Sequence, residues 1–244
     1  MGLREAGQRR MLGLTIIDGA REIERALQAG IAFDQTFYVS GHNEDLLKNL
    51  RLKKVGLVEV SGKVMEKLAY GERNEGILAV VKTPHQSLKD LKLSAHALIV
   101  VLESLEKPGN LGAILRTCDG VGVEAVLVCD PKTDAFNPNV IRSSTGIIFS
   151  MPLVCADPSE ISSFLKSRKI KTCAAAPLAD KFYTQIDLKE AWALVLGSED
   201  CGLSEFWLKN ADARIKIPMK GKADSLNVST SAAVILYEAL RQRS

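Results

Sequence analysis

The spacing of hydrophobic residues divides the chain into two regions with different patterns. Between residues 19 and 30, Ile23, Ala26 and Leu27 recur on one face of a helix that closes on Gly30, a residue typical of helix ends. Short β-branched stretches follow, separated by charged and glycine-containing segments, and predict the strands FYV, VGLVEV and GILAVV. We therefore expect a small α/β domain over residues 1–84.

Continuous apolar stretches dominate after residue 97, as is typical of strands that are buried on both faces of a parallel sheet. These stretches are LIVVL, AVLVC, IKTCAAA, ALVLG and RIKI. Helical spacing is found in NLGAILRTCDGVG, PSEISSFLKSRK and VSTSAAVILYEALRQR. We expect a second α/β domain with a mostly parallel sheet over residues 97–244, joined to the first by a polar linker at 85–96.

The composition is that of a globular protein, since 244 residues with 46% hydrophobic and 25% charged side chains allow a sizeable core. No apolar run is long enough to span a bilayer, and the first residues lack the apolar stretch of a secretory signal. Five cysteines without a C-x-x-C pair and only three histidines argue against a disulfide framework and against a metal site. We expect a cytoplasmic protein that uses no metal.

The net charge of +3 is concentrated in the first third of the chain. Residues 1–92 hold 15 Lys and Arg against 12 Asp and Glu, whereas residues 93–244 hold 17 of each kind. A local positive excess favours a polyanionic partner, although mild basicity is also common on faces that are merely solvated. Nucleic-acid binding by the first domain is therefore one interpretation of this excess.

Two common nucleotide-binding motifs are absent from the sequence. The segment LIVVLESLEKPGNLG places a glycine-containing turn after a strand, but it lacks G-x-G-x-x-G and the acidic residue that would follow at a fixed spacing. No G-x-x-x-x-G-K-[ST] phosphate loop occurs either. A dehydrogenase and a P-loop NTPase therefore have no support in the sequence.

Three separate segments combine loop-forming glycine or proline with polar side chains, and each follows an apolar strand. They are KPGNLGAILRTCDGVG with Asn110 and Arg116, LGSEDCGLSE with Glu199, and IPMKGKADSLNVSTSAA with Ser225 and Asn227. Ligands in open α/β sheets bind beyond the carboxyl ends of the strands, so we expect the three segments to converge on one site.

The order and spacing of N-x-G-x-x-x-R, L-G-S-E-x-x-G-L-S and I-P-M-x-G-x-x-x-S-L-N-V-S resemble the three signature motifs of the SpoU (TrmH) family of RNA 2′-O-ribose methyltransferases, in the SPOUT superfamily. The resemblance covers about residues 98–243. It implies that residues 192–243 form a deep trefoil knot, a rare exception to the rule against threaded chains. It also implies a homodimer with active sites near the subunit interface, and S-adenosylmethionine as the methyl donor.

The first domain resembles the substrate-binding domain in front of many rRNA-modifying members, on the segments IIDGAREIERALQAG and NEGILAVV. That domain is an RNA-binding α/β type shared with certain ribosomal proteins, and members that modify tRNA usually lack it. The resemblance therefore favours rRNA as the substrate. A tRNA ribose methyltransferase, an antibiotic-resistance rRNA methyltransferase and a catalytically silent RNA-binding or ribosome-assembly protein stay open as alternatives.

By the same resemblance, loops that follow the last strands hold the donor, mainly through backbone groups. The residues concerned are Leu196, Gly197, Ile217, Pro218, Met219 and Leu226. For the side chains of Ile217 and Leu226 alone, core packing explains the pattern equally well.

The residues that the resemblance assigns to catalysis are Asn110, Arg116, Glu199, Ser225 and Asn227. Arg116 is the family's proposed activator of the 2′-hydroxyl, yet a guanidinium is effectively never deprotonated in a protein. We expect Arg116 to bind the target phosphate and to stabilise the developing alkoxide, and base behaviour stays open. Glu199 is expected to hold Arg116 or Asn110 in register, unless it is only a helix-start carboxylate.

Helix capping is the structural alternative for three of these side chains. Ser225 and Asn227 precede the last helix and are expected to combine capping with substrate positioning, and Asn110 is placed to cap LGAILRT. Arg142 and Ser144 lie in NPNVIRSSTG, which resembles a further family segment on the RNA entry side. Arg142 is a candidate phosphate contact, with a plain turn followed by a helix as the alternative.

Overall fold

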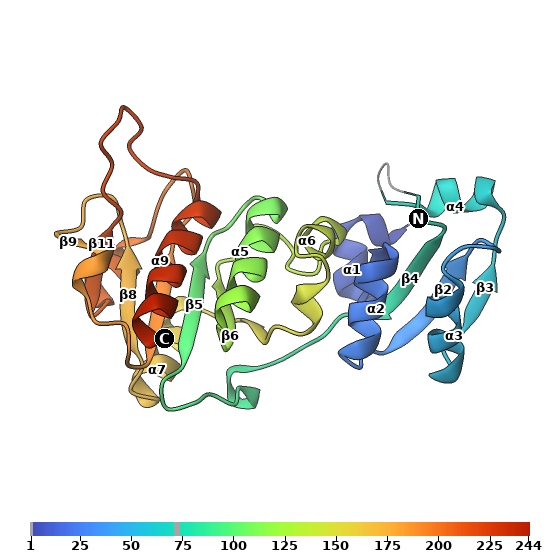
Figure 1. The fold of residues 1–244 in the computed structure, drawn as a ribbon, viewed down its shortest axis with the longest axis horizontal. Helices are drawn as coiled ribbons and strands as arrows, with labels where there is room; N and C mark the ends of the chain where they lie inside the picture. The colour runs from blue at the N-terminus through green and yellow to red at the C-terminus, as the bar shows by residue number, and fades with distance from the viewer. Residues whose placement is uncertain (1, 71–73) are drawn as a thin grey trace. The chain divides into compact units, whose positions relative to one another are not determined.

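The computed structural model describes residues 2–70 and 74–244 and divides into two compact units (Figure 1). The first unit runs to Pro84 and also includes Asp134–Ser150. The second unit contains His85–Thr133 and Met151–Ser244. Among the helices of the described ranges, none combines the length and the apolar character that a membrane span requires.

The first unit is built on a four-stranded mixed sheet with the strand order β1-β4-β2-β3. β4 runs antiparallel to β1 and β2, whereas β2 and β3 are parallel. The strands are β1 (Leu14–Asp18), β2 (Phe33–Tyr38), β3 (Leu57–Glu59) and β4 (Ile77–Lys82). The helices are η1 (Gly2–Arg4), α1 (Ala6–Leu12), α2 (Ala20–Gln28), α3 (Glu44–Leu52), α4 (Gly62–Leu68), α6 (Pro138–Ser143) and η3 (Ile147–Phe149).

The core of this unit follows the hydrophobic spacing of the sequence. Ile23 and Ala26 of α2 are fully buried, and α2 packs against β1 and β4. The central strand β4 buries Ala79 and Val81 completely, as expected for a strand with a neighbour on each side. The helix and the three strands that the sequence predicts here are confirmed, and β1 is an additional strand.

Specific bonds hold the segment Asp134–Ser150 against α1 and α2. Arg9, whose side chain is only 3% exposed, forms an ion pair of 2.7 Å with Asp134. Nη1 of Arg25 donates to the carbonyl and the hydroxyl oxygen of Thr145, at 2.7 Å each. The sequence pattern groups this segment with the second domain, whereas these side-chain contacts attach it to the first unit.

The second unit contains a seven-stranded sheet with the order β7-β6-β5-β10-β8-β11-β9, in which every pair of neighbours is parallel. The strands are β5 (Leu98–Glu103), β6 (Ala125–Cys129), β7 (Leu153–Cys155), β8 (Lys171–Ala175), β9 (Lys181–Phe182), β10 (Trp192–Leu196) and β11 (Ala213–Lys216). The helices are η2 (Leu88–Asp90), α5 (Pro108–Val121), α7 (Pro158–Ser167), η4 (Tyr183–Gln185), α8 (Glu205–Asn210) and α9 (Val228–Arg243). The predicted parallel α/β fold is confirmed.

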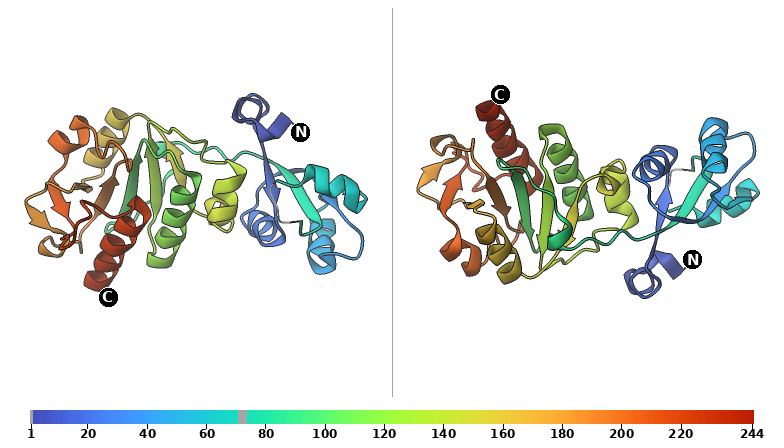
Figure 2. Two further views of the ribbon diagram at one scale, coloured as in Figure 1. Left: turned by 90° about the horizontal axis from the view of Figure 1, so that it is seen from above. Right: turned by 90° about the horizontal axis from the view of Figure 1, so that it is seen from below.

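Helices cover both faces of this sheet. α5 and α9 lie side by side on one face, and α7 and α8 lie on the other (Figure 2). Strand residues such as Val101 and Val195 pack with Trp207 of α8 in one fully buried cluster. Because β5, β10, β8 and β11 are parallel neighbours, the loops that follow them leave the sheet at the same edge.

Candidate functional site

A cavity of about 730 Å³ lies beyond the carboxyl ends of β8, β10 and β11 and reaches the first turns of α9. Pockets for small ligands commonly have volumes of about 300–1,000 Å³. Five of the six expected donor-binding residues line it, namely Leu196, Gly197, Ile217, Met219 and Leu226. The sixth, Pro218, lies between two of them but is not part of the wall.

The loop after β10 forms part of this wall and has a fixed shape. Ser198 and Gly202 exchange two backbone hydrogen bonds of 3.2 and 3.0 Å. A Cβ atom at Gly197 would lie 2.1 Å from the carbonyl oxygen of Gly202, so a side chain does not fit there. At the end of the loop, the carboxylate of Glu103 in β5 accepts hydrogen bonds of 2.7 Å from the backbone and the hydroxyl of Ser204.

Two of the expected catalytic side chains, those of Asn110 and Asn227, meet a third, that of Glu199, which lies in the wall of the cavity. Nδ2 of Asn110 donates to Oε1 of Glu199 at 2.8 Å, and Nδ2 of Asn227 also donates to this oxygen. Nδ2 of Asn227 lies 3.3 Å from Oδ1 of Asn110. Nζ of Lys107 donates to the second oxygen, Oε2, at 2.5 Å. Of the two partners expected for Glu199, the structure brings Asn110 to it and not Arg116.

The helices α5 and α9 place the two asparagines of this cluster. Asn227 precedes α9, and its Oδ1 accepts the backbone N–H of Ser229 at 2.9 Å, so it caps the helix as expected. Its contact with Glu199 was not expected, and substrate positioning by this residue stays a prediction. α5 begins at Pro108, and its N-cap residue is Lys107. Asn110 therefore lies in the first turn and points its amide at Glu199 instead of capping the helix.

Hydrogen bonds shift the pKa values of Glu199 and Lys107 in this cluster. The hydrogen bond from Lys107 is the largest cause of a lowered pKa of Glu199 and outweighs burial, which raises the pKa; the asparagine amides and the lysine charge lower it further. The same contact raises the pKa of Lys107. Glu199 is therefore an anion at neutral pH, and both of its oxygens accept hydrogen bonds.

Arg116 lies apart from this cluster. It is exposed on α5, it does not line the cavity, and within the described ranges no hydrogen bond or ion pair involves its side chain. Six residues along a helix correspond to a rotation of about 240°, so Arg116 and Asn110 project from different faces of α5. Ser225, in contrast, lines the cavity.

The two residues expected to contact RNA belong to the first unit. Nη2 of Arg142 donates to Oδ2 of Asp18 at 3.1 Å, and the arginine side chain keeps 26% of its surface exposed. Burial raises the pKa of Asp18, against the opposing effect of a hydrogen bond from the backbone of Tyr70 and of the Arg142 charge. Ser144 is fully buried, and its hydroxyl donates to the carbonyl of Ile141 at 3.0 Å, so this side chain has no exposed surface for RNA in this structure.

The cavity also contains residues outside the three motifs. The segment Ala175–Ala179 after β8 lines it, as do Ser231 and Ile235 of α9. The sequence predicts the strand IKTCAAA, and the rule that ligands bind beyond the carboxyl ends of strands points to the segment that follows it. Lys107, which contacts Glu199, lies three residues before Asn110, where the first motif begins, and carries no signal of its own.

Within the described ranges the cysteines form no disulfide. Burial raises the pKa of Cys118, Cys129 and Cys173 to about 12, so these thiols stay protonated. Within residues 2–70 and 74–244, no group of three or more His, Cys, Asp and Glu side chains is placed to hold a metal ion.

Comparison with protein families gives two matches along the chain. The sequence model of the SpoU rRNA Methylase family matches residues 97–237. The MRM3-like substrate binding domain matches residues 1–79.

Individual relatives match nearly the whole chain. The 23S rRNA (uridine(2479)-2′-O)-methyltransferase of Streptomyces viridochromogenes is 30% identical over 99% of this chain and 87% of its own length. A crystal structure of an RNA 2′-O ribose methyltransferase superposes with a TM-score of 0.85 at 42% identity, covering 99% of this chain and 93% of that one. The SpoU methyltransferase AviRb from Streptomyces viridochromogenes, in complex with AdoMet, superposes with a TM-score of 0.90 at 28% identity, covering 99% and 94%.

Proposed function

The chain belongs to the SpoU rRNA methylase family, and from this membership we infer that it transfers a methyl group from S-adenosylmethionine to a ribose 2′-hydroxyl of RNA. Ribosomal RNA is the substrate, since several relatives that match along most of the chain are 23S rRNA methyltransferases and the first 79 residues match a substrate-binding domain. The observation that carries this function is the cavity beside the Glu199 cluster, at the edge where the parallel strands β8, β10 and β11 end.

We propose that the donor binds in this cavity. S-adenosylmethionine would supply a methyl group on a sulfonium: the ribose oxygen bonds to the methyl carbon, the carbon–sulfur electron pair stays on sulfur, and the hydroxyl proton passes to water. The cavity volume fits a ligand of this size, and the missing side chain at Gly197 lets the backbone of Gly202 pack against it, which shapes this part of the wall. Leu196, Ile217, Met219 and Leu226 contribute apolar walls, and Pro218 fixes the loop between Ile217 and Met219.

Glu199 acts as an organiser and not as the base that takes the hydroxyl proton. Its oxygens accept hydrogen bonds from Lys107, Asn110 and Asn227, which lower its pKa and make it a weak base. An anion held in this way orients both amides and keeps the start of α5 in register with the loop after β10. Asn110 and Asn227 then position the ribose, together with the Ser225 hydroxyl.

Arg116 acts on the RNA and not on the donor. A guanidinium exposed on α5, without a protein partner in the described part of the chain, is available to bind the phosphate next to the target ribose and to stabilise its alkoxide. We propose a homodimer that forms through the face of α5 and α9, where Tyr237 is also 54% exposed. Arg116 then lies near the subunit interface, close to the RNA that both subunits bind.

Two further features are proposed from family membership. The segment from residue 192 to residue 243, which supplies the donor loops, forms a deep trefoil knot. The chain works as two domains, a substrate domain over residues 1–84 and a catalytic domain over residues 97–244. Arg142 remains a proposed phosphate contact, because a quarter of its side chain is exposed beside Asp18.

Methyl transfer to separate RNA pools tests the substrate. Purified protein is incubated with S-adenosylmethionine labelled in the methyl group and with either ribosomal RNA or transfer RNA, each free of the modification. We expect label in ribosomal RNA alone. Label in transfer RNA alone would overturn the choice of substrate, and label in neither, under conditions where the donor binds, would favour a silent RNA-binding protein.

A further inference from the structure

One edge of the catalytic unit carries a cluster of cations next to the donor cavity. β9 is the outermost strand of the sheet and pairs with β11, and the loop from Ile217 to Asn227 joins β11 to α9. Figure 1 shows this loop projecting beyond the ends of the strands. We call this surface the basic rim, and it consists of Lys181, Phe182, Arg214, Lys216, Lys220 and Lys222.

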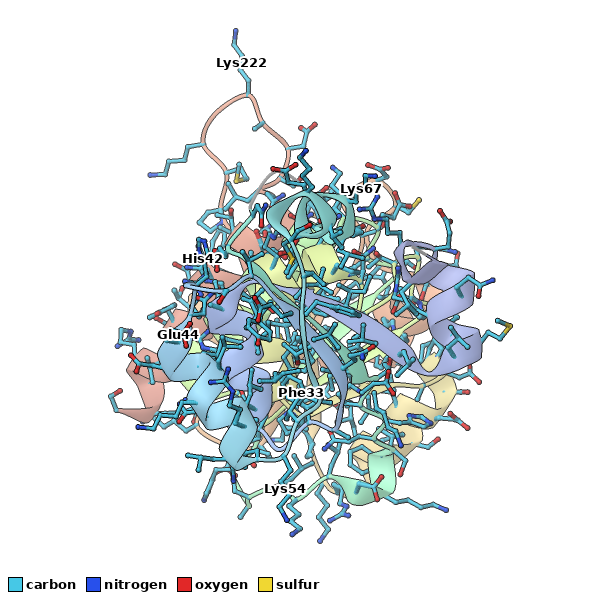
Figure 3. All side chains as sticks on the ribbon, turned by 90° about the vertical axis from the view of Figure 1, so that its right-hand side faces the viewer. Phe33, His42, Glu44, Lys54, Lys67 and Lys222 are labelled. Carbon is cyan, nitrogen blue, oxygen red and sulfur yellow. The ribbon has the colours of Figure 1, made fainter. Side chains whose placement is uncertain are left out.

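The positive charge of the basic rim is mostly unpaired. Arg214 lies 3.8 Å from Asp180, and within the described ranges no ion pair involves Lys181, Lys220 or Lys222. Figure 3 shows Lys222 at the tip of the loop, pointing into solvent. Exposed cations without acidic partners are often only solvated, so charge alone does not identify a ligand.

A second feature of the surface is its exposed apolar side chains. The Phe182 ring is 38% exposed, and Nζ of Lys216 lies 5.5 Å from its centroid. Leu178 and Met219, both in the cavity wall, are 96% and 37% exposed. Single-stranded RNA offers phosphates for cations and base faces for aromatic and apolar side chains, so this combination fits that ligand.

We propose that the basic rim binds the single-stranded RNA that flanks the target nucleotide, with phosphates on Lys220 and Lys222 and one base stacked on Phe182. The proposal rests on the proposed methyltransferase function and specifies how the RNA reaches the donor. It places the RNA beside the cavity because Arg214 and Lys216 of the rim also line that cavity.

A second copy of the chain fits this surface less well. The edge strand β9 is only two residues long, and lysines beside it disfavour pairing with another strand. Two copies would also bring like charges together, whereas a polyanion neutralises them. Measuring the oligomeric state of the rim variants therefore distinguishes RNA from a second copy of the chain as the partner of this surface.

The salt dependence of RNA binding tests the phosphate contacts. The variant is Lys220→Ser/Lys222→Ser, and the control is Lys166→Ser/Lys189→Ser, which removes two exposed lysines outside the rim and the cavity. Binding of a short single-stranded RNA is measured by fluorescence anisotropy over a salt series. Each lost phosphate contact reduces the slope of log affinity against log salt by about 0.7, so we expect a reduction of about 1.4 for the rim variant and none for the control.

Phe182 variants test the stacking contact. Phe182→Ala should weaken RNA binding about 5- to 100-fold at every salt concentration, whereas Phe182→Tyr, which keeps the ring, should bind as the unchanged protein does. Donor affinity measured by calorimetry should be the same in all variants, which also confirms that they fold.

Three results would overturn the proposal. One is a salt slope that is unchanged in the lysine variant, and another is equal RNA affinity of Phe182→Ala and Phe182→Tyr. The third is dissociation of a dimer in the lysine variant, since the rim would then be an interface between copies. If the unchanged protein methylates RNA, any of these results rejects RNA binding by the basic rim and leaves the proposed function intact. If the unchanged protein does not methylate RNA, the methyltransferase function itself is rejected.

Discussion

The side-chain amide of Asn110 donates a hydrogen bond of 2.8 Å to the carboxylate of Glu199, although 89 residues separate them along the chain. The contact exists because β5 and β10 are parallel neighbours, so the segments that follow them leave the sheet together. Asn227 joins the same carboxylate from the start of α9. The three sequence motifs therefore meet at one anion.

The charge of Glu199 should be needed for catalysis. Glu199→Gln keeps the shape of the side chain but replaces the carboxylate with a neutral amide. The negative charge that strengthens the three hydrogen bonds is therefore lost. Hydrogen bonds to charged groups contribute about 1.5–3 kcal/mol, so we expect the single-turnover rate to fall about 10- to 100-fold. Glu205→Gln is the matched control, because Glu205 forms a similar 2.5 Å pair with Lys209 away from the cavity. Equal rates for the two variants would contradict the role of Glu199.

Lys107 should set the acid limit of activity. Its hydrogen bond is the largest cause of the lowered pKa of Glu199, so Lys107→Met should raise that pKa. A lowered pKa keeps the Glu199 carboxyl ionised to lower pH, and the ionised form is lost as the pH falls through the pKa of the folded protein. The acid limb of the pH–rate profile should therefore move to higher pH in Lys107→Met and stay in place in Lys107→Arg. An identical acid limb in both variants would show that Lys107 does not act through Glu199.

Gly197 should tolerate no side chain. The added methyl group of Gly197→Ala would lie 2.1 Å from the Gly202 carbonyl, so the loop must move. Overpacking typically costs about 1–3 kcal/mol, and we expect a lower melting temperature together with weaker donor binding in calorimetry. Gly221→Ala is the control, since nothing lies within 4 Å of its Cβ position. Unchanged donor affinity in Gly197→Ala would mean that this loop does not contact the donor.

Arg116 should matter for transfer and hardly at all for stability. Arg116→Ala removes an exposed side chain without a partner in the described ranges, so the free energy of unfolding should change by less than about 0.5 kcal/mol. Removing a charge aimed at a developing oxyanion commonly costs about 100- to 1,000-fold in rate. Arg116→Lys should restore little, because an ammonium does not reproduce the planar fork. A variant Arg116→Ala that kept more than about a tenth of the single-turnover rate would exclude this role.

Local patterns predict the elements that carry strong periodicity. The segment VSTSAAVILYEALRQR is α9 from its first residue to its last, because its helical spacing has no interruption. β1 (LTIID) is not among the predicted strands, although its length equals that of the predicted strand AVLVC, because a short apolar run fits a strand and part of a buried helix equally well. The position of Asp134–Ser150 depends on long-range contacts such as the ion pair of Arg9 and Asp134, which no local pattern encodes.

The site shows the same division between local and long-range information. The motifs identify Asn110, Glu199 and Asn227, because their residue types and order are specific. Lys107 is not identified, since a lysine before a proline has the pattern of a solvated charge until the fold brings Glu199 to it. The direction in which the Arg116 side chain points could not be predicted from local patterns either, because the rotation of α5 relative to the sheet depends on tertiary packing.

The position of the transferred methyl group tests the proposed ribose methylation most directly. Ribosomal RNA that lacks the modification is incubated with the protein and with S-adenosylmethionine carrying a deuterated methyl group, and is then digested to nucleosides for mass spectrometry. Transfer to a 2′-hydroxyl predicts one nucleoside whose labelled methyl group fragments with the ribose, and a neighbouring phosphodiester that resists alkaline cleavage. A labelled methyl group that fragments with the base, or no label in RNA despite donor binding, would contradict it.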